Sequence, residues 1–117
     1  MKQHKPATVL ELLVAARELI GVREHWCFGA LANTKLGRVT APSSPAAVSW
    51  CAIGALYKIA GARHQTERNE AKQLLDDEAD LLACVPIVVL NDEGNYTRVL
   101  RLYDRAIARA RELGAQS

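Results

Sequence analysis

The sequence is poor in aromatic residues and lacks long apolar runs. Aromatic side chains make up 5% of the 117 residues, whereas half of all residues are hydrophobic. The core must therefore be built mainly from Leu, Val, Ile and Ala, which favours closely packed helices. No stretch reaches the roughly 20 consecutive apolar residues of a membrane-spanning helix, and the sequence predicts a soluble, cytoplasmic protein without membrane contacts.

An excess of charge of one sign is also lacking, since the formal net charge is only +2. So small a charge disfavours nucleic acid as the main partner. The three cysteines, Cys27, Cys51 and Cys84, include no Cys-x-x-Cys pair. In a reducing cytoplasm this pattern favours free thiols, and Cys27–Cys51 is the one pair that we consider for a disulfide.

Recognisable catalytic motifs are absent. The chain contains no glycine-rich phosphate loop, no paired-carboxylate motif and no nucleophile elbow. Its possible metal ligands are scattered singly rather than in the pairs typical of zinc sites. We therefore expect no cofactor and no metal, and we favour a non-enzymatic protein over an enzyme.

The amino-terminal part begins with basic residues and an apolar stretch, as secretory signals do. Glu11, Arg17 and Glu18 interrupt that stretch, which predicts an amphipathic helix of the mature protein instead. Thr8 and Glu11 fit the capping-box pattern at a helix start. Gly21 is the predicted end of this helix.

The most apolar segment is residues 45–60. Ser44 fits an N-cap and Pro45 the first helical position, and Lys58 is the only charge before Gly61. A helix that is apolar on nearly every side is usually buried on nearly every side. We predict that residues 45–60 form the central helix.

Three further segments complete the predicted fold. Helical periodicity covers residues 66–84, and a second periodic helix covers residues 98–113 with Thr97 as N-cap. Between them, residues 85–92 are β-branched and contain Pro86, which excludes a helix interior and predicts a short strand or extended segment. We expect the acidic cluster Asp76, Asp77, Glu78 and Asp80 to lie on the outer face of the 66–84 helix.

These elements predict a mainly α fold. It is a compact bundle of about four helices around the apolar helix 45–60, in a single domain that covers residues 1–117. Its β structure is limited to a short strand or a small hairpin, for which residues 30–33 and 38–41 are the candidates.

Two segments share Trp-Cys followed by Gly-Ala-Leu: "HWCFGALAN" from His25 and "SWCAIGALYK" from Ser49. Their different contexts argue against a repeat. A nucleophilic cysteine needs a lowered pKa, and a helix starting at residue 45 places Cys51 too far inside to gain it from the helix dipole. The spacing does not bring a base such as His25 or His64 to Cys51, so core packing is favoured, with each indole N–H bonded to a carbonyl.

The segment "NDEGNYT", from Asn91, is the best candidate for a functional loop. Asn91 and Asp92 fit a tight turn, and they could instead orient a base or hold a polar ligand. If a ligand site exists, we assign it to Trp26, Trp50, Asn91 and Asp92. A structural turn is the favoured interpretation.

Four arginines trace one stripe of the last predicted helix. A stripe of this kind could follow a phosphate backbone. An ordinary solvated face, or pairing with the acidic cluster of the 66–84 helix, is favoured because the net charge is small. The four residues are Arg98, Arg101, Arg105 and Arg109.

The order of these motifs resembles a small bacterial and bacteriophage domain family of unknown function. The resemblance is carried by Trp-Cys at 26–27, Trp-Cys-x-x-Gly-Ala at 50–55, Asn-Asp at 91–92, Thr97 and Asp-Arg-Ala-Ile at 104–107. It does not extend to residues 63–83. It implies a protein of bacteria or phages, often carried on mobile DNA, but no activity or cofactor.

The resemblance directs attention to Cys51, Asn91 and Asp92 as the catalytic residues if the protein is an enzyme. Our leading hypothesis is a non-enzymatic helical module that binds a protein or a small ligand, as a homodimer. The alternative is a cysteine-dependent hydrolase or transferase that uses Cys51. A nucleic-acid accessory protein is a weaker third hypothesis.

Overall fold

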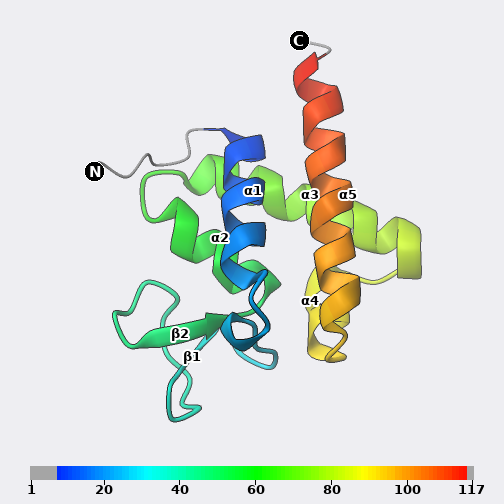
Figure 1. Cartoon of the computed structure of the whole chain (residues 1–117). Coiled ribbons are helices and arrows are strands. Elements are labelled where there is room, and N and C mark those ends of the chain that lie inside the picture. Colours follow the sequence, from blue (N-terminus) through cyan, green and yellow to red (C-terminus); the bar gives the residue numbers. More distant parts are fainter. Residues whose placement is uncertain (1–7, 116–117) are drawn as a thin grey trace.

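The computed structural model describes residues 8–115, and within them the chain is mainly helical (Figure 1). Five α-helices, a short 3-10 helix and a two-stranded antiparallel sheet make up this part of the chain, as the predicted mainly α fold requires. In chain order they are α1 (Val9–Ile20), the 3-10 helix (Arg23–His25), β1 (Ala32–Thr34), β2 (Ala47–Trp50), α2 (Ala52–Ala60), α3 (Gln65–Ala83), α4 (Ile87–Asp92) and α5 (Tyr96–Ala115).

Helix α1 begins and ends where the sequence predicts. The Thr8 hydroxyl oxygen accepts a hydrogen bond from the Glu11 N–H at 3.1 Å, and the same hydroxyl donates to the Glu11 carboxylate at 3.1 Å. This satisfies one backbone donor that a helix start would otherwise leave free. Gly21 is the C-cap, so both predicted ends are confirmed.

Helix α2 begins at Ala52, so the predicted helix over residues 45–60 is wrong in its first half. Ser44 accepts from the Ala46 N–H as a cap does, but only a turn follows. Residues 47–50 instead pair with β1, in a register that places Ala32 opposite Trp50. Valine and tryptophan suit a strand, and pairing with a distant segment overrides the local helix-start signal.

The predicted hairpin between residues 30–33 and 38–41 is present only as a fragment. An isolated bridge joins Asn33 to Val39, and the Thr34 N–H donates to the Arg38 carbonyl at 2.8 Å. The regular partner of β1 is β2, which lies further along the chain. The predicted arm 38–41 is therefore wrong as a strand.

Residues 87–92 form helix α4 rather than the predicted strand or extended segment. Pro86 stands at the N-cap of α4, where its missing N–H is harmless because the first donors of a helix have no intrahelical partner. The Asp76 carboxylate of α3 accepts from the Ile87 N–H at 2.9 Å. This contact from a neighbouring helix stabilises a helix too short to form alone.

Helices α3 and α5 match their predicted spans, with two corrections. Glu78 is not on the outer face of α3: it is buried, and its carboxylate accepts from the Arg105 guanidinium at 2.8 Å. The cap of α5 is not Thr97, which lies inside the helix. The Asn95 side chain accepts from the Arg98 N–H at 3.0 Å and takes that role.

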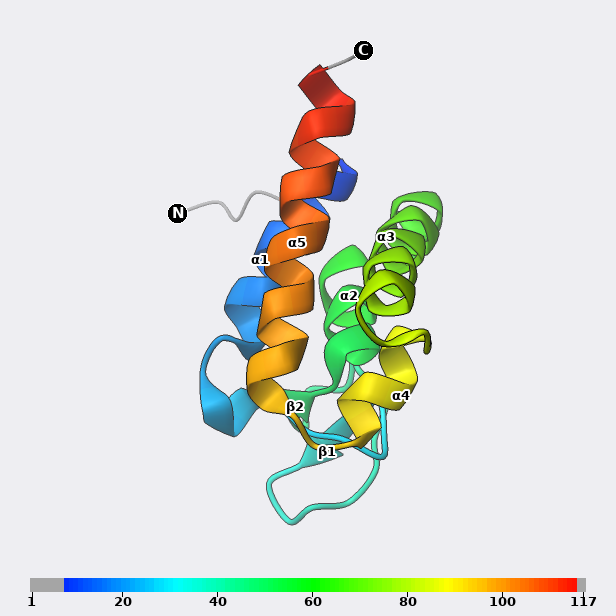
Figure 2. The ribbon, with the colours of Figure 1, turned by 90° about the vertical axis from the view of Figure 1, so that its right-hand side faces the viewer.

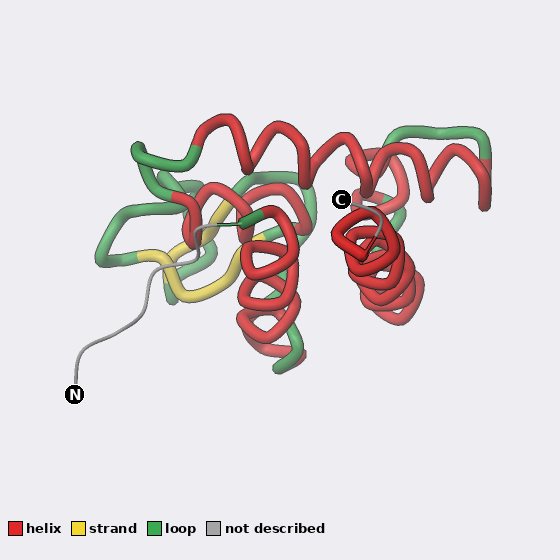
Figure 3. Tube along the Cα trace, turned by 90° about the horizontal axis from the view of Figure 1, so that it is seen from above, coloured by secondary structure: helices red, strands yellow, loops and turns green. Residues whose placement is uncertain are grey.

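The helices surround one apolar core, with the small sheet below α1 and α2, and α4 beside the lower turns of α5, in the view of Figure 1. In Figure 2, α4 lies beneath α2 and α3, close to the start of α5. Seen from above, α3 crosses behind α1 and α5 (Figure 3). Tyr103 of α5 is fully buried in the core, and its hydroxyl donates to the Ala52 carbonyl at the start of α2. Within residues 8–115, no helix combines the length and apolar character needed to cross a membrane.

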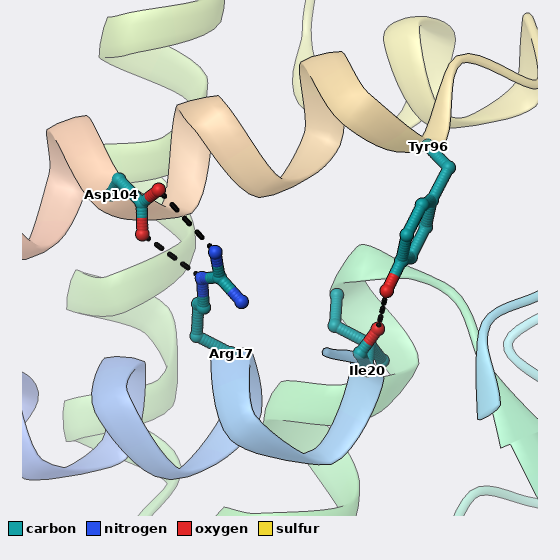
Figure 4. Close-up of polar contacts among 4 residues, drawn as sticks. All are labelled: Arg17, Ile20, Tyr96 and Asp104. Carbon is teal, nitrogen blue, oxygen red and sulfur yellow. Dashed lines mark hydrogen bonds and ion pairs between the residues drawn. The ribbon is translucent and has the colours of Figure 1, made fainter. Parts of the chain in front are cut away.

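Two hydrogen-bonded contacts join the last turn of α1 to the first half of α5. The Arg17 guanidinium donates to the Asp104 carboxylate at 2.9 Å, and the Tyr96 hydroxyl donates to the Ile20 carbonyl at 2.7 Å (Figure 4). The two contacts lie two turns apart on α5 and fix the orientation of the last helix against the first.

Candidate functional site

The two Trp-Cys segments lie beside one another in the structure. A bridge joins Trp26 to Trp50, and the Cys27 N–H donates to the Trp50 carbonyl at 3.1 Å. The Trp50 indole N–H donates to the Pro42 carbonyl at 2.9 Å, as predicted for a buried tryptophan. The two similar segments therefore contact each other directly, through an isolated bridge beside the β1–β2 sheet.

The Asn91 side chain joins three segments at this place. Its amide oxygen accepts from the Trp26 indole N–H at 2.8 Å and from the Ala52 N–H at 2.9 Å. Its amide nitrogen donates to the Cys27 carbonyl at 3.2 Å. Asn91 is only 1% exposed, and these three bonds use both acceptor positions and one of the two donor positions of its amide. We call this arrangement of Asn91, Trp26, Cys27 and Ala52 the Asn91 junction.

Cys51 stands at the N-cap of α2, and the prediction that it lies well inside a helix is wrong. Its sulfur accepts from the Gly54 N–H at 3.2 Å. Burial nevertheless raises the pKa of the Cys51 thiol, and the backbone N–H groups of Gly54 and Ile53 only partly oppose this. The residue is 4% exposed. The thiol therefore remains protonated at neutral pH and packs as a small apolar group.

Neither predicted base is bonded to a thiol. A ring nitrogen of His25 lies 3.3 Å from the Leu19 carbonyl, and His64 lies beside Glu67 at 3.7 Å. Asp92 accepts from the Gly29 N–H at 3.0 Å. Its negative charge raises the pKa of Cys51 further, which is the opposite of activation.

The close approach of another segment explains why the residue at position 54, after the second Trp-Cys pair, is a glycine. A β-carbon at this position would lie 1.8 Å from the Leu31 carbonyl oxygen. The same carbonyl accepts from the Cys51 N–H at 3.1 Å. Only glycine therefore allows the segment before β1 to approach the first turn of α2 this closely.

Residues 4–109 match the profile of a protein family of unknown function. The chain belongs to family DUF6197. No curated protein and no solved structure matches it. The predicted resemblance to a domain family of unknown function is thereby confirmed at that level, while the residue pattern and the bacterial or phage origin stay predictions. The DUF6197 match covers both Trp-Cys segments and Asn91, so the whole Asn91 junction lies within it.

The structure of this DUF6197 chain also shows a partly exposed aromatic cluster that sequence reasoning missed. The Arg23 guanidinium lies over the rings of Trp26 and Tyr96, at 5.3 and 4.9 Å from their centroids. The Phe28 ring lies 5.7 Å from that of Trp26 and is 55% exposed. We call Arg23, Phe28 and Tyr96 the Phe28 surface. Its only sequence signal is the concentration of aromatic letters in an aromatic-poor chain.

The remaining predicted sites have ordinary surroundings in this DUF6197 chain. Of the arginine stripe, Arg105 pairs with Glu78 of α3, as one of the predicted alternatives has it, and Arg109 lies 3.9 Å from Glu112. All three cysteines are free thiols. Over residues 8–115, no cluster of three or more His, Cys, Asp or Glu side chains is placed to hold a metal ion.

Proposed function

We propose that this protein is a non-enzymatic binding module that contacts a protein partner through the Phe28 surface. The observation that carries the proposal is that Phe28 is more than half exposed although its neighbours are firmly held. Trp26 is bonded to Asn91 on one side, and the Gly29 N–H is bonded to Asp92 on the other. Phe28 is therefore an apolar side chain presented to solvent by a rigid backbone.

The chemistry of this surface suits a protein partner. Aromatic residues and arginine are enriched among the residues that contribute most to binding at protein interfaces. A fixed backbone reduces the entropy lost on association. Because the Phe28 ring projects from the surface, it fits a concave site on another protein better than it fits a small ligand. The predicted ligand residues Trp26, Trp50 and Asn91 are buried, and Trp26 contacts the Phe28 and Tyr96 rings of this surface.

Site-specific photo-crosslinking tests the proposal. A photoreactive phenylalanine analogue replaces Phe28 in cells that naturally encode the chain, and the same analogue replaces Leu36 as a control. Leu36 is apolar and 82% exposed but lies outside the Phe28 surface. We expect a discrete crosslinked protein from position 28, lost on Arg23→Ala, and none from position 36. Absence of a crosslink at position 28, or equal crosslinks from both positions, would contradict the proposal.

A second candidate is the cysteine-dependent hydrolase or transferase, because Cys51 does occupy a helix N-cap. Its burial, its raised pKa and the use of Asn91 in structural hydrogen bonds argue against it. Alkylation rates in the native protein, read by mass spectrometry, decide between the two. Exposed Cys84 is the internal control. Modification of Cys51 as fast as Cys84 below pH 7 would support the enzyme and overturn our proposal.

A further inference from the structure

The end of the molecule that carries the last turns of α5 has an open apolar groove. It has a volume of about 720 Å³ and lies between the start of α1, the middle of α3 and the last turns of α5. The side chains of Val9, Leu10, Leu74, Ala110 and Leu113 supply most of its lining. We call it the α5 groove. The Phe28 surface lies near the start of α5 (Figure 1), so the two surfaces are separate.

The apolar stripe of α5 continues beyond the part of the helix that its neighbours cover. Tyr103 and Ala106 of the stripe are fully buried, Ala110 is nearly so, and Leu113, one turn further, is 46% exposed. Figures 1 and 2 show the last turns of α5 extending past α1 and α3. A helix stripe that stays apolar where cover ends is typical of a surface that packs against another chain.

The groove also carries one charge of each sign. Glu70 of α3 and Arg111 of α5 both belong to its lining, and both are exposed. Among residues 8–115, neither takes part in an ion pair. A surface with apolar centre and opposite charges on two sides is complementary to a copy of itself turned by a two-fold axis.

We propose that the α5 groove is the interface of a homodimer. In a two-fold arrangement, the end of α5 from each copy enters the groove of the other. Leu113 then packs on the apolar lining that includes Leu74 of the second copy, and Arg111 faces the second copy's Glu70. The same pair of contacts occurs twice, as an isologous interface requires. This proposal does not depend on the Phe28 surface.

Sedimentation velocity of the full chain, from about 1 µM to about 500 µM, tests the proposal. We expect a dimer that Leu113→Asp dissociates, with Kd raised at least about 100-fold because an unpaired charge enters an apolar interface. Leu36→Asp is the control, since Leu36 is exposed outside the groove, and it should leave Kd unchanged. Circular dichroism checks that both variants keep their helices.

Charge reversal supplies an independent test that does not disturb the apolar lining. Glu70→Arg alone and Arg111→Glu alone should each raise Kd about 10-fold, since each replaces two attractions with repulsions. The double variant should restore the original Kd. A chain that stays monomeric over the whole concentration range, a dimer that Leu113→Asp leaves intact, or a double variant no better than the single ones would each overturn the proposal.

Discussion

The surroundings of the two ends of α5 differ in whether their side chains find partners within the chain. Near its start lies the Asn91 junction, where buried donors and acceptors of three segments meet in one amide side chain. Near its end lies the α5 groove, where apolar side chains such as Leu113 remain uncovered. The junction is complete within one chain, whereas the groove leaves apolar side chains of the described residues 8–115 exposed.

From this difference we expect the Asn91 junction to contribute to folding stability and the α5 groove to contribute to association. A buried hydrogen bond is costly to break because the abandoned partner has no water to replace it. An exposed leucine contributes little to folding because it contacts solvent in both states. Substitutions at the junction should therefore affect unfolding strongly, and substitutions in the groove should affect it weakly. Four measurements test this difference.

The largest effect is expected for Asn91→Ala. The change leaves the Trp26 indole N–H, the Ala52 N–H and the Cys27 carbonyl without their partner, and should lower the free energy of unfolding by about 4 kcal/mol. Asn95→Ala, which removes only the cap of α5, should lower it by about 1 kcal/mol. Urea denaturation measures both. Equal losses for the two variants would show that the junction is no stronger than an ordinary cap.

Gly54→Ala should follow with a loss of about 3 kcal/mol. The added methyl group meets the Leu31 carbonyl oxygen, so β1 and α2 must separate and their buried contacts loosen. Gly114→Ala is the control, because a β-carbon there meets no neighbour within 4 Å. Alanine in a helix should stabilise the chain slightly, by less than about 1 kcal/mol. A tolerated Gly54→Ala would refute the close approach.

Alkaline pH should lower the free energy of unfolding by an intermediate amount, through the buried groups Cys51 and Tyr103. Burial raises the pKa of Cys51 above its usual value of 9.0 and that of Tyr103 well above 10.0. In the unfolded chain these groups lose their protons first, so their contribution is full below pH 9 and decreases as pH rises further. Stability should fall by about 1 kcal/mol per pH unit per group. The loss from Cys51 begins near pH 9 and that from Tyr103 near pH 10, so urea midpoints between about pH 8 and pH 11 measure both, and Cys51→Ala should reduce the slope in the lower part of this range.

The smallest effect on folding is expected at the groove. Leu113→Ser, studied at a concentration where the chain is monomeric, should change the free energy of unfolding by less than about 0.5 kcal/mol. Leu102→Ala in the same helix removes a fully buried side chain and should cost about 3 kcal/mol. Similar losses for both leucines would mean that the end of α5 is already part of the core.

The parts of the fold that were predicted correctly are those with local signals. Helix α1 has a capping pair and a glycine stop, and α3 and α5 have clear periodicity. The start of α2 was missed because residues 47–50 pair with β1, which only the folded chain brings near. Helix α4 was missed because its start depends on the Asp76 carboxylate of α3, a contact with no local trace.

The candidate site also depends on contacts between distant segments that local signals do not predict. The sequence singled out Cys51, Asn91 and Trp26, and the structure brings them together, but the bonds that Asn91 makes could not be read from spacing. Burial of Glu78 was missed because its partner Arg105 lies on another helix. The Phe28 surface depends on Arg23 and Tyr96 meeting across a long stretch of chain, and no periodic pattern encodes such a meeting.

The contacts between α1 and α5 in Figure 4 have a consequence for synthesis of the chain. Arg17 is made 87 residues before its partner Asp104, and Ile20 is made 76 residues before its partner Tyr96. Until then the face of α1 that packs against α5 lacks this cover, and a long loop must close to bring the two helices together. The nascent chain therefore completes its core only after α5 has been synthesised. Chains released early expose that face and are substrates for chaperones and proteases.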